Sequence, residues 1–128
     1  MNDPATQSGC DGRTILLVED DDAVRQVTGI LLGGLGYRVL EAAQAPAALA
    51  VLEAERAIDL LLTDISMPGG MSGLELAAIA VRRRPALRVV VISGDTIAVA
   101  AVPGHAGTVL QKPYRFEALT RALEAALL

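Results

Sequence analysis

The feature of this sequence that most constrains its fold is a repeated alternation of short apolar runs with longer segments of helical period. The clearest run, residues 15–18, is wholly apolar and ends abruptly at four acidic residues. Strands have such wholly apolar sequences when helices cover both faces of a parallel sheet. Expected strands lie at 15–18, 37–40, 58–63, 87–92 and 108–111, and expected helices at 22–35, 44–56, 73–84, 96–102 and 115–127. The alternation predicts an α/β fold with a parallel sheet and right-handed crossover connections.

Charged residues mark the expected ends of two helices. Asp22 is the expected N-cap of the first helix, because a short carboxylate can accept a hydrogen bond from the first turn of backbone. Residues 82–84, three consecutive arginines, come at the end of the third helix, where positive charge complements the helix dipole. We expect these arginines to be solvated.

The length of the chain, 128 residues, suits one domain with a single core. Residues 1–12 are polar, contain proline and glycine and show no periodicity, so we expect a flexible tail. The expected domain then covers residues 13–128. Because aromatic residues are only 2% of the chain, the core must be built from leucine, valine, isoleucine and alanine.

Charge, cysteine content and hydropathy exclude several classes of protein. A formal net charge of −4 argues against direct binding of nucleic acid, which needs a basic face. Cys10 is the only cysteine, so the chain has no internal disulfide and no cysteine-based metal site. No apolar run reaches the roughly 18 residues of a membrane span, and the N-terminus does not resemble a secretory signal. We therefore expect a cytoplasmic protein without membrane contact.

Chemically useful residues follow the ends of four expected strands, where open α/β sheets bind their ligands. Glu19 and Asp20 follow the first strand, and Asp64 the third; Ser93 and Lys112 follow the fourth and fifth. If the first and third strands are neighbours, three carboxylates converge and repel one another unless a cation joins them. An all-oxygen ligand set of this kind suits Mg²⁺ together with a phosphoryl oxygen.

No residue near these strand ends is an obvious general base, since the only histidine, His105, lies in a glycine-rich stretch. Asp64 is therefore better interpreted as a nucleophile that accepts a phosphoryl group and becomes an aspartyl phosphate. Lys112 and the Ser93 hydroxyl would neutralise and hold the phosphoryl oxygens.

Four stretches of sequence together resemble the receiver domain of two-component response regulators. They are residues 15–25 (ILLVEDDDAVR), 61–76 (LLTDISMPGGMSGLEL), 89–95 (VVVISGD) and 111–114 (QKPY). The resemblance covers about residues 13–128 and implies a doubly wound, flavodoxin-like parallel sheet with strand order 2-1-3-4-5.

The resemblance also implies roles for individual residues. Mg²⁺ would bind Glu19, Asp20, Asp64 and the backbone carbonyl of Ser66. A histidine kinase or a histidine phosphotransfer protein would phosphorylate Asp64. Ser93 and Lys112 would contact the phosphoryl group, and the bond between Lys112 and Pro113 would be cis. The domain would then act as a signalling switch on an unknown downstream protein.

Three features depart from the family pattern. Val109 stands where the family usually has an aromatic ring that couples to the strand-four hydroxyl, so we expect Ser93 and residues 94–107 to carry any response. Residues 96–107 contain no lysine or arginine, unlike the charged dimer face of DNA-binding regulators. The loop after Pro68 has one extra residue, at Gly69–Gly70, which is similar to receivers attached to hybrid sensor kinases.

Two other functions remain possible from the residues alone, although a non-enzymatic switch is the principal hypothesis. In a Mg²⁺-dependent phosphohydrolase, Asp20 would be the nucleophile and Asp22 its partner, but Asp64 and its loop would be unexplained. A receiver-like binding module would never carry phosphate, and the complete set of acidic residues argues against it.

Overall fold

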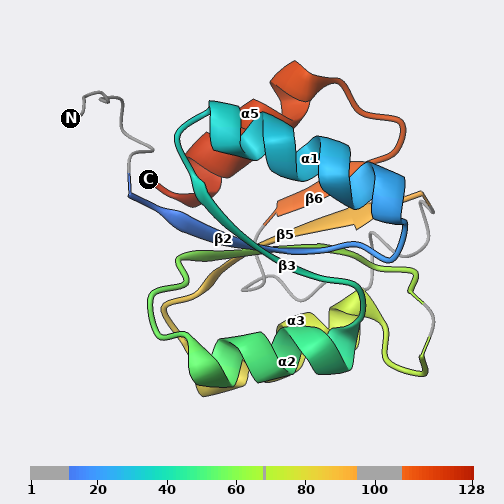
Figure 1. Ribbon diagram of the computed structural model, residues 1–128, viewed down its shortest axis with the longest axis vertical. Helices are drawn as coiled ribbons and strands as arrows, with labels where there is room; N and C mark the ends of the chain where they lie inside the picture. The colour runs from blue at the N-terminus through green and yellow to red at the C-terminus, as the bar shows by residue number, and fades with distance from the viewer. Residues whose placement is uncertain (1–11, 68, 95–107) are drawn as a thin grey trace.

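The computed structural model describes residues 12–67, 69–94 and 108–128, and its centre is a five-stranded parallel sheet (Figure 1). Along the sheet the order is β3-β2-β4-β5-β6, which is the expected order 2-1-3-4-5 when strands are counted along the chain. Helices α1 and α5 cover one face, and α2 and α3 cover the other. The doubly wound fold class is therefore confirmed. The strands are β2 (Thr14–Val18), β3 (Arg38–Ala42), β4 (Leu60–Asp64), β5 (Arg88–Ser93) and β6 (Thr108–Gln111); the helices are α1 (Asp22–Gly34), α2 (Ala45–Ala54), α3 (Gly73–Arg83) and α5 (Phe116–Ala126).

The main differences from the expected strand bounds are at the starts of β3 and β4. Tyr37 precedes β3 because its N–H donates to the carbonyl of Leu32 at 3.3 Å, which keeps it in the turn after α1. Gly36, with φ of 100°, makes that turn in the left-handed region. The expected strand at 58–63 begins only at Leu60. The expected helix at 96–102, residues 1–11 of the expected tail at 1–12, Cys10 and His105 lie outside the described residues.

The N-terminus of α1 is capped by Asp21 and not by the expected Asp22. The Asp21 side chain accepts a hydrogen bond from the N–H of Val24 at 3.0 Å, and the helix begins one residue later. Asp22 instead lies in the first turn, where its charge complements the helix dipole. No helix in the described part of the chain is long and apolar enough to cross a membrane.

Side chains of each central strand alternate between two cores, one on each face of the sheet. On β2, Ile15 and Leu17 pack with α1 and α5, whereas Leu16 and Val18 pack with α2 and α3. All four are at most 2% exposed. This double burial explains why the strand is wholly apolar in sequence, and it commits the polar residues after it to the edge of the sheet.

Arg84 joins the two helices on one face instead of pointing into solvent as expected. Its guanidinium donates to the backbone carbonyls of Leu52, Glu55 and Arg56, the latter two at 2.5 and 3.1 Å. These carbonyls belong to the last turn of α2 and the residues just after it, where helix carbonyls lack intrahelical partners. Arg84 therefore caps α2 from the end of α3.

We predict that Arg84→Ala lowers the free energy of unfolding by about 1–3 kcal/mol, because it leaves several carbonyls without a charged donor. Urea denaturation followed by circular dichroism measures the change. Arg83→Ala is the matched control, since the ion pair of Arg83 with Glu53 is exposed on both sides and contributes roughly 0–1 kcal/mol. Equal effects of the two substitutions would contradict the capping role.

Candidate functional site

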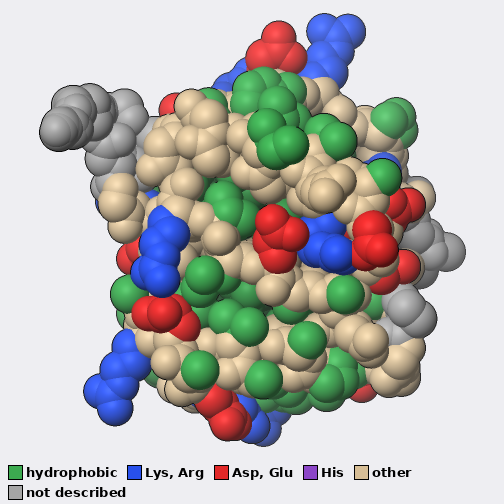
Figure 2. Space-filling view, viewed as in Figure 1, with side chains coloured by type: hydrophobic (Ala, Val, Ile, Leu, Met, Phe, Trp, Pro, Cys, Tyr) green, Lys and Arg blue, Asp and Glu red, His purple; other side chains and the backbone are tan. Residues whose placement is uncertain are grey.

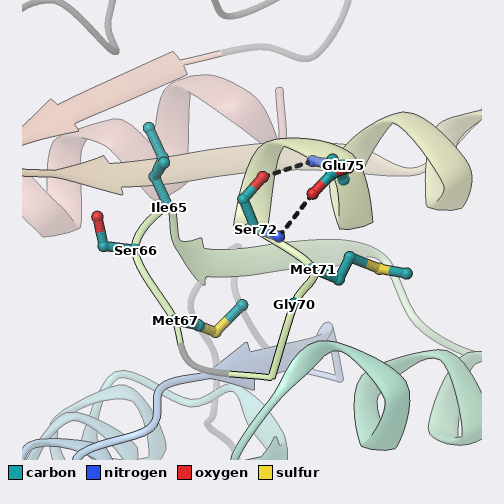
Figure 3. A pocket seen from close by; sticks show the side chains of 7 residues that line it. All are labelled: Ile65, Ser66, Met67, Gly70, Met71, Ser72 and Glu75. Atoms are coloured by element: carbon teal, nitrogen blue, oxygen red, sulfur yellow. Dashed lines mark hydrogen bonds between the residues drawn. The ribbon is translucent and has the colours of Figure 1, made fainter.

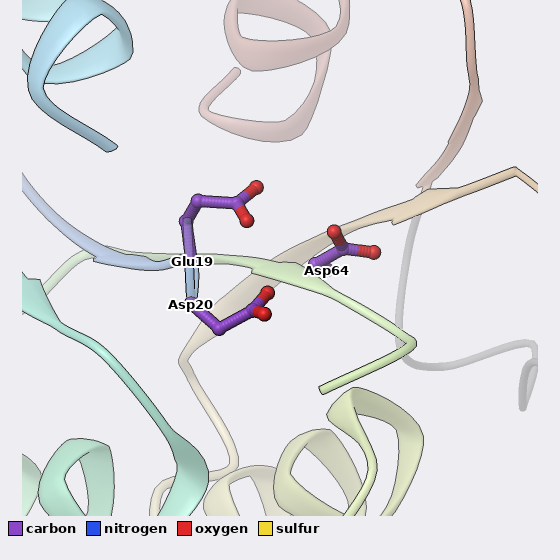
Figure 4. Close-up of side chains that lie close together, drawn as sticks. All are labelled: Glu19, Asp20 and Asp64. Atoms are coloured by element: carbon purple, nitrogen blue, oxygen red, sulfur yellow. The ribbon is translucent and has the colours of Figure 1, made fainter. Parts of the chain in front are cut away.

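Three carboxylates meet at the edge of the sheet where β2 and β4 end. The parallel register aligns Val18 with Thr63, so the residues that follow both strands lie side by side. One carboxylate oxygen from each of Glu19, Asp20 and Asp64 lies within 4.8 Å of the others (Figure 4). Glu19 and Asp64 are buried, whereas Asp20 is exposed. The fold therefore brings together the three acidic residues that the sequence singled out.

Lys112 adds a positive charge to this cluster. Its Nζ lies 2.8 Å from Oδ2 of Asp64, and the Asp64 side chain is only 8% exposed. The N–H of Lys112 donates to the carbonyl of Ser93 at 2.7 Å, which continues the ladder between β5 and β6. The peptide bond before Pro113 is cis, as the resemblance implied.

The two remaining candidate residues come from the end of β5 and from the loop after β4. Ser93 ends β5 and is 2% exposed, one register position beyond the pairing of Asp64 with Ile92. Ser66 lies in the loop after β4 and lines an open cavity of about 630 Å³ (Figure 3). The far side of this cavity is formed by Ser72 and Glu75, which make reciprocal hydrogen bonds at the start of α3.

The structure also describes the loop insertion at Gly69–Gly70 and Val109, which stands where the family usually has an aromatic ring. Gly69 and Gly70 have φ of 97° and 85°, a backbone region that favours glycine, and a Cβ on Gly69 would lie 2.9 Å from Oε1 of Gln44. Val109 is half-buried on β6 and pairs with Val91. Most of residues 94–107, which we expect to carry a response, lie outside the described residues.

Burial and neighbouring charge perturb the acid–base chemistry of the site. Burial raises the pKa of Glu19 above its ordinary 4.5, and the charge of Asp64 adds to the rise; the hydrogen bond from the N–H of Asp21, at 3.1 Å, opposes it. The hydrogen bond to Asp64 raises the pKa of Lys112, which keeps that side chain cationic. Burial raises the pKa of Tyr114, which lies two residues after Lys112 in the chain.

The donor set of the cluster fits a hard divalent cation. All its ligand atoms are carboxylate oxygens, and two come from consecutive residues, so only a few protein groups would enter the coordination shell. Mg²⁺ prefers such a shell, because it retains several waters and accepts one or two carboxylates together with a phosphoryl oxygen. A bound cation would also remove much of the repulsion among the carboxylates.

Gly73 supports the site in a way that the sequence did not reveal. A Cβ at this position would lie 2.0 Å from the backbone oxygen of Asp64, and the Gly73 N–H donates to the carbonyl of Ile65 at 2.8 Å. Only glycine therefore lets α3 begin so close to the end of β4. The sequence signals the start of the helix through Ser72 and Glu75, but the close approach depends on tertiary structure.

Comparisons with known proteins find relatives along most of the chain. The sequence model of the response regulator receiver domain matches residues 15–124. A cyclic di-GMP phosphodiesterase of Thermotoga maritima is 33% identical over 117 residues, which are 89% of this chain and 31% of that protein. This chain thus spans about a third of the length of that curated relative.

Solved structures give the same result. A CheY-like response regulator receiver domain protein of Methanospirillum hungatei is 31% identical with a TM-score of 0.81, covering 90% of this chain and 93% of that one. The receiver domain of the hybrid histidine kinase CckA is 38% identical with a TM-score of 0.75, covering 90% and 99%.

The raised pKa of Glu19 predicts how Glu19→Gln changes stability with pH. Between pH 4.5 and the raised value, the folded state holds the proton more tightly than the unfolded chain, so stability falls as pH rises through this window. Above the raised pKa the unfavourable ionisation is fully present. Glutamine removes the charge and retains an acceptor for the N–H of Asp21.

In metal-free buffer, Glu19→Gln should therefore raise the melting temperature at pH 7, and the gain should disappear below about pH 4.5, where the wild-type carboxyl is also neutral. Thermal unfolding from pH 4 to pH 8, roughly the range around this window, measures it. Glu53→Gln, at an exposed carboxylate, serves as the control. A gain that is independent of pH would contradict the assignment to ionisation.

Proposed function

Because this chain belongs to the response regulator receiver domain family, we propose that Asp64 accepts a phosphoryl group and that the phosphorylated domain acts as a signalling switch. The observation that carries this proposal is the 2.8 Å contact of Lys112 with Asp64 beside two further carboxylates. A nucleophilic carboxylate with a cation on one side and a cation-binding cluster on the other suits phosphoryl transfer, which depends on charge neutralisation.

The donor of the phosphoryl group is a phosphohistidine of a histidine kinase or a histidine phosphotransfer protein. A carboxylate oxygen of Asp64 attacks the phosphorus, a new P–O bond forms, and the P–N bond breaks. The imidazole nitrogen leaves with the electron pair of that bond. Lys112 stays next to Asp64 and offsets the added negative charge of the phosphoryl group. The Ser93 hydroxyl donates a hydrogen bond to a phosphoryl oxygen.

Mg²⁺ would be the cofactor of this reaction, and Glu19, Asp20, Asp64 and the backbone carbonyl of Ser66 would hold it. When bound, it neutralises charge on the phosphoryl oxygens during transfer. The three carboxylates within 4.8 Å of one another support this assignment.

An exposed apolar stripe on α1 supports docking of the donor protein next to the acidic cluster. Val24, Val27, Ile30 and Leu31 are between 38% and 72% exposed, and Figure 2 shows hydrophobic side chains on the surface over this helix. Contiguous apolar surface of this kind is typical of protein interfaces. Because α1 begins directly after the acidic residues, an apolar helix of the donor lying on the stripe would bring its phosphohistidine to Asp64.

The proposed mechanism also bears on where the domain acts and on what it contacts. We propose that it acts in the cytoplasm, on a protein target and without direct contact to nucleic acid or membrane. The inserted glycine and the 38% identity to the receiver of a hybrid histidine kinase favour attachment to such a kinase, although a stand-alone domain remains the alternative.

The two rival functions explain the geometry less well. A phosphohydrolase would need Asp22 beside Asp20, but the Asp22 carboxylate is 88% exposed and bonds Arg25 at 2.6 Å. The phosphodiesterase relative does not change this, because this chain matches only a third of it. A binding module without phosphate would not require the contact of Lys112 with a buried carboxylate.

We predict that Asp64→Asn abolishes phosphorylation, since it preserves volume and removes the nucleophile. Incubation with acetyl phosphate and Mg²⁺, followed by mass spectrometry of the intact protein, should detect one phosphoryl group on the wild type and none on the variant. Asp59→Asn is the matched control, because Asp59 accepts a hydrogen bond from Thr14 at the opposite end of the sheet and asparagine can still accept it. Wild-type yield on Asp64→Asn would overturn the assignment.

We also predict that Mg²⁺ raises the melting temperature, because a bound cation relieves repulsion among the clustered carboxylates. Asp20→Asn should reduce this rise. Asp21→Asn removes the same charge, lies outside the cluster and keeps the helix cap, so it should retain most of the rise. A melting temperature unchanged by Mg²⁺ up to roughly tens of millimolar, a generous upper range for oxygen sites, would count against the metal site.

A further inference from the structure

Arg25, on the first turns of α1, makes three polar contacts around the acidic turn that joins β2 to α1. Its Nη1 donates to the backbone carbonyl of Glu19 at 2.8 Å, and its Nη2 bonds Asp22 at 2.6 Å. Its Nε lies 3.3 Å from Oε1 of Glu41 on β3. The Arg25 side chain is 19% exposed, but its partners Asp22 and Glu41 are 88% and 43% exposed, so the contact with the Glu19 carbonyl is the one that is partly shielded from solvent.

The contact with the carbonyl of Glu19 is unusual because that carbonyl belongs to the peptide linking two of the clustered acidic residues. On the other side of the same residue, the N–H of Glu19 donates to the carbonyl of Ala42 at 3.1 Å. Ala42 and Glu41 are consecutive on β3. The backbone of Glu19 is therefore tied to β3 twice, directly through its N–H and Ala42, and indirectly through its carbonyl, Arg25 and Glu41.

α1 has a glycine at the point where Glu41 approaches it. A Cβ on Gly29 would lie 3.0 Å from Oε2 of Glu41, closer than most side chains tolerate. Glycine is otherwise unfavourable inside a helix. Its presence leaves room for the Glu41 carboxylate that pairs with Arg25.

We propose that Arg25 is a positioning residue for the metal site: it holds the Glu19–Asp20 peptide so that both carboxylates face the same cation, and Glu41 anchors it. This inference rests on the proposed Mg²⁺ site. Carboxylates this close repel one another, so a frame that holds them before the cation arrives reduces the rearrangement that binding requires. The asymmetric contacts, one to backbone and two to carboxylates, exploit the fixed fork of a guanidinium, which lysine lacks.

Positioning and simple charge make opposite predictions for Mg²⁺ affinity. If Arg25 acted only as a nearby positive charge, its removal would make the cluster more negative and Mg²⁺ would bind more tightly. If Arg25 positions the ligands, its removal weakens binding. The sign of the change therefore distinguishes the two roles.

The experiment measures Mg²⁺ binding by isothermal titration calorimetry for the wild type, Arg25→Ala and Arg25→Lys. We expect Arg25→Ala to raise the dissociation constant about tenfold, as is common for residues that orient metal ligands. Arg25→Lys keeps the charge, so any weakening in that variant reports lost geometry. Arg13→Ala is the matched control, because Arg13 is also half-buried and donates to a backbone carbonyl, that of Leu127, away from the cluster.

Phosphorylation by acetyl phosphate gives a second readout. For Arg25→Ala we expect a higher half-saturating Mg²⁺ concentration, while the rate at saturating Mg²⁺ stays close to that of the wild type. Asp64 and Lys112 are untouched by the substitution, so the chemical step itself should be preserved.

The outcomes separate the inference from the function on which it rests. Failure of the wild type to bind Mg²⁺ would remove the proposed metal site itself. Normal binding by the wild type with equal or tighter binding by Arg25→Ala would overturn only the positioning role. If Arg25→Ala does not fold, Arg25→Lys and Glu41→Gln decide: weaker Mg²⁺ binding by both supports the role, and wild-type binding by both overturns it.

Discussion

The backbone of β4 can form its hydrogen bonds only within the sheet, because both faces of the strand are covered by packed side chains. Leu60, Leu61 and Leu62 are fully buried, and β4 pairs with β2 on one side and β5 on the other. Helices must then lie on both faces, the strands run parallel, and their carboxyl ends reach one edge. The polar side chains that follow these strands therefore gather at this edge, and the cluster at Asp64 is a consequence of the way the core is built.

Positive charges surround this cluster in two different ways. Lys112 contacts the carboxylate of Asp64 from the end of β6, where it can respond directly to any change in charge on that residue. Arg25 contacts the backbone carbonyl of Glu19 and acidic side chains at the periphery. We therefore assign Lys112 to the proposed chemistry and Arg25 to the proposed positioning of the metal ligands. On the opposite face of the sheet, Arg84 stabilises the end of α2 and takes no part in the site.

Local patterns were sufficient for most features that depend on one element, although the N-cap of α1 is Asp21 and not the expected Asp22. The apolar run before Glu19 predicted a buried strand, and the residues after it were correctly expected at the edge of the sheet. Predictions were wrong where two elements compete for a residue. Tyr37 was expected in a strand, but its N–H donates to a carbonyl in the last turns of α1. Arg84 was expected to be solvated at a helix end, but its guanidinium donates to carbonyls at the end of α2.

The sequence by itself determined the order of the elements and the identity of the residues at the strand ends, because periodicity, glycine and proline act over a few neighbouring residues. Only the tertiary structure decided which of those residues meet. Lys112 and Asp64 are separated by 48 positions, and their contact depends on the order of β4, β5 and β6 in the sheet. The approach of Gly73 to Asp64, and of Arg25 to Glu41, depends on how a helix packs against strands, which no local pattern encodes.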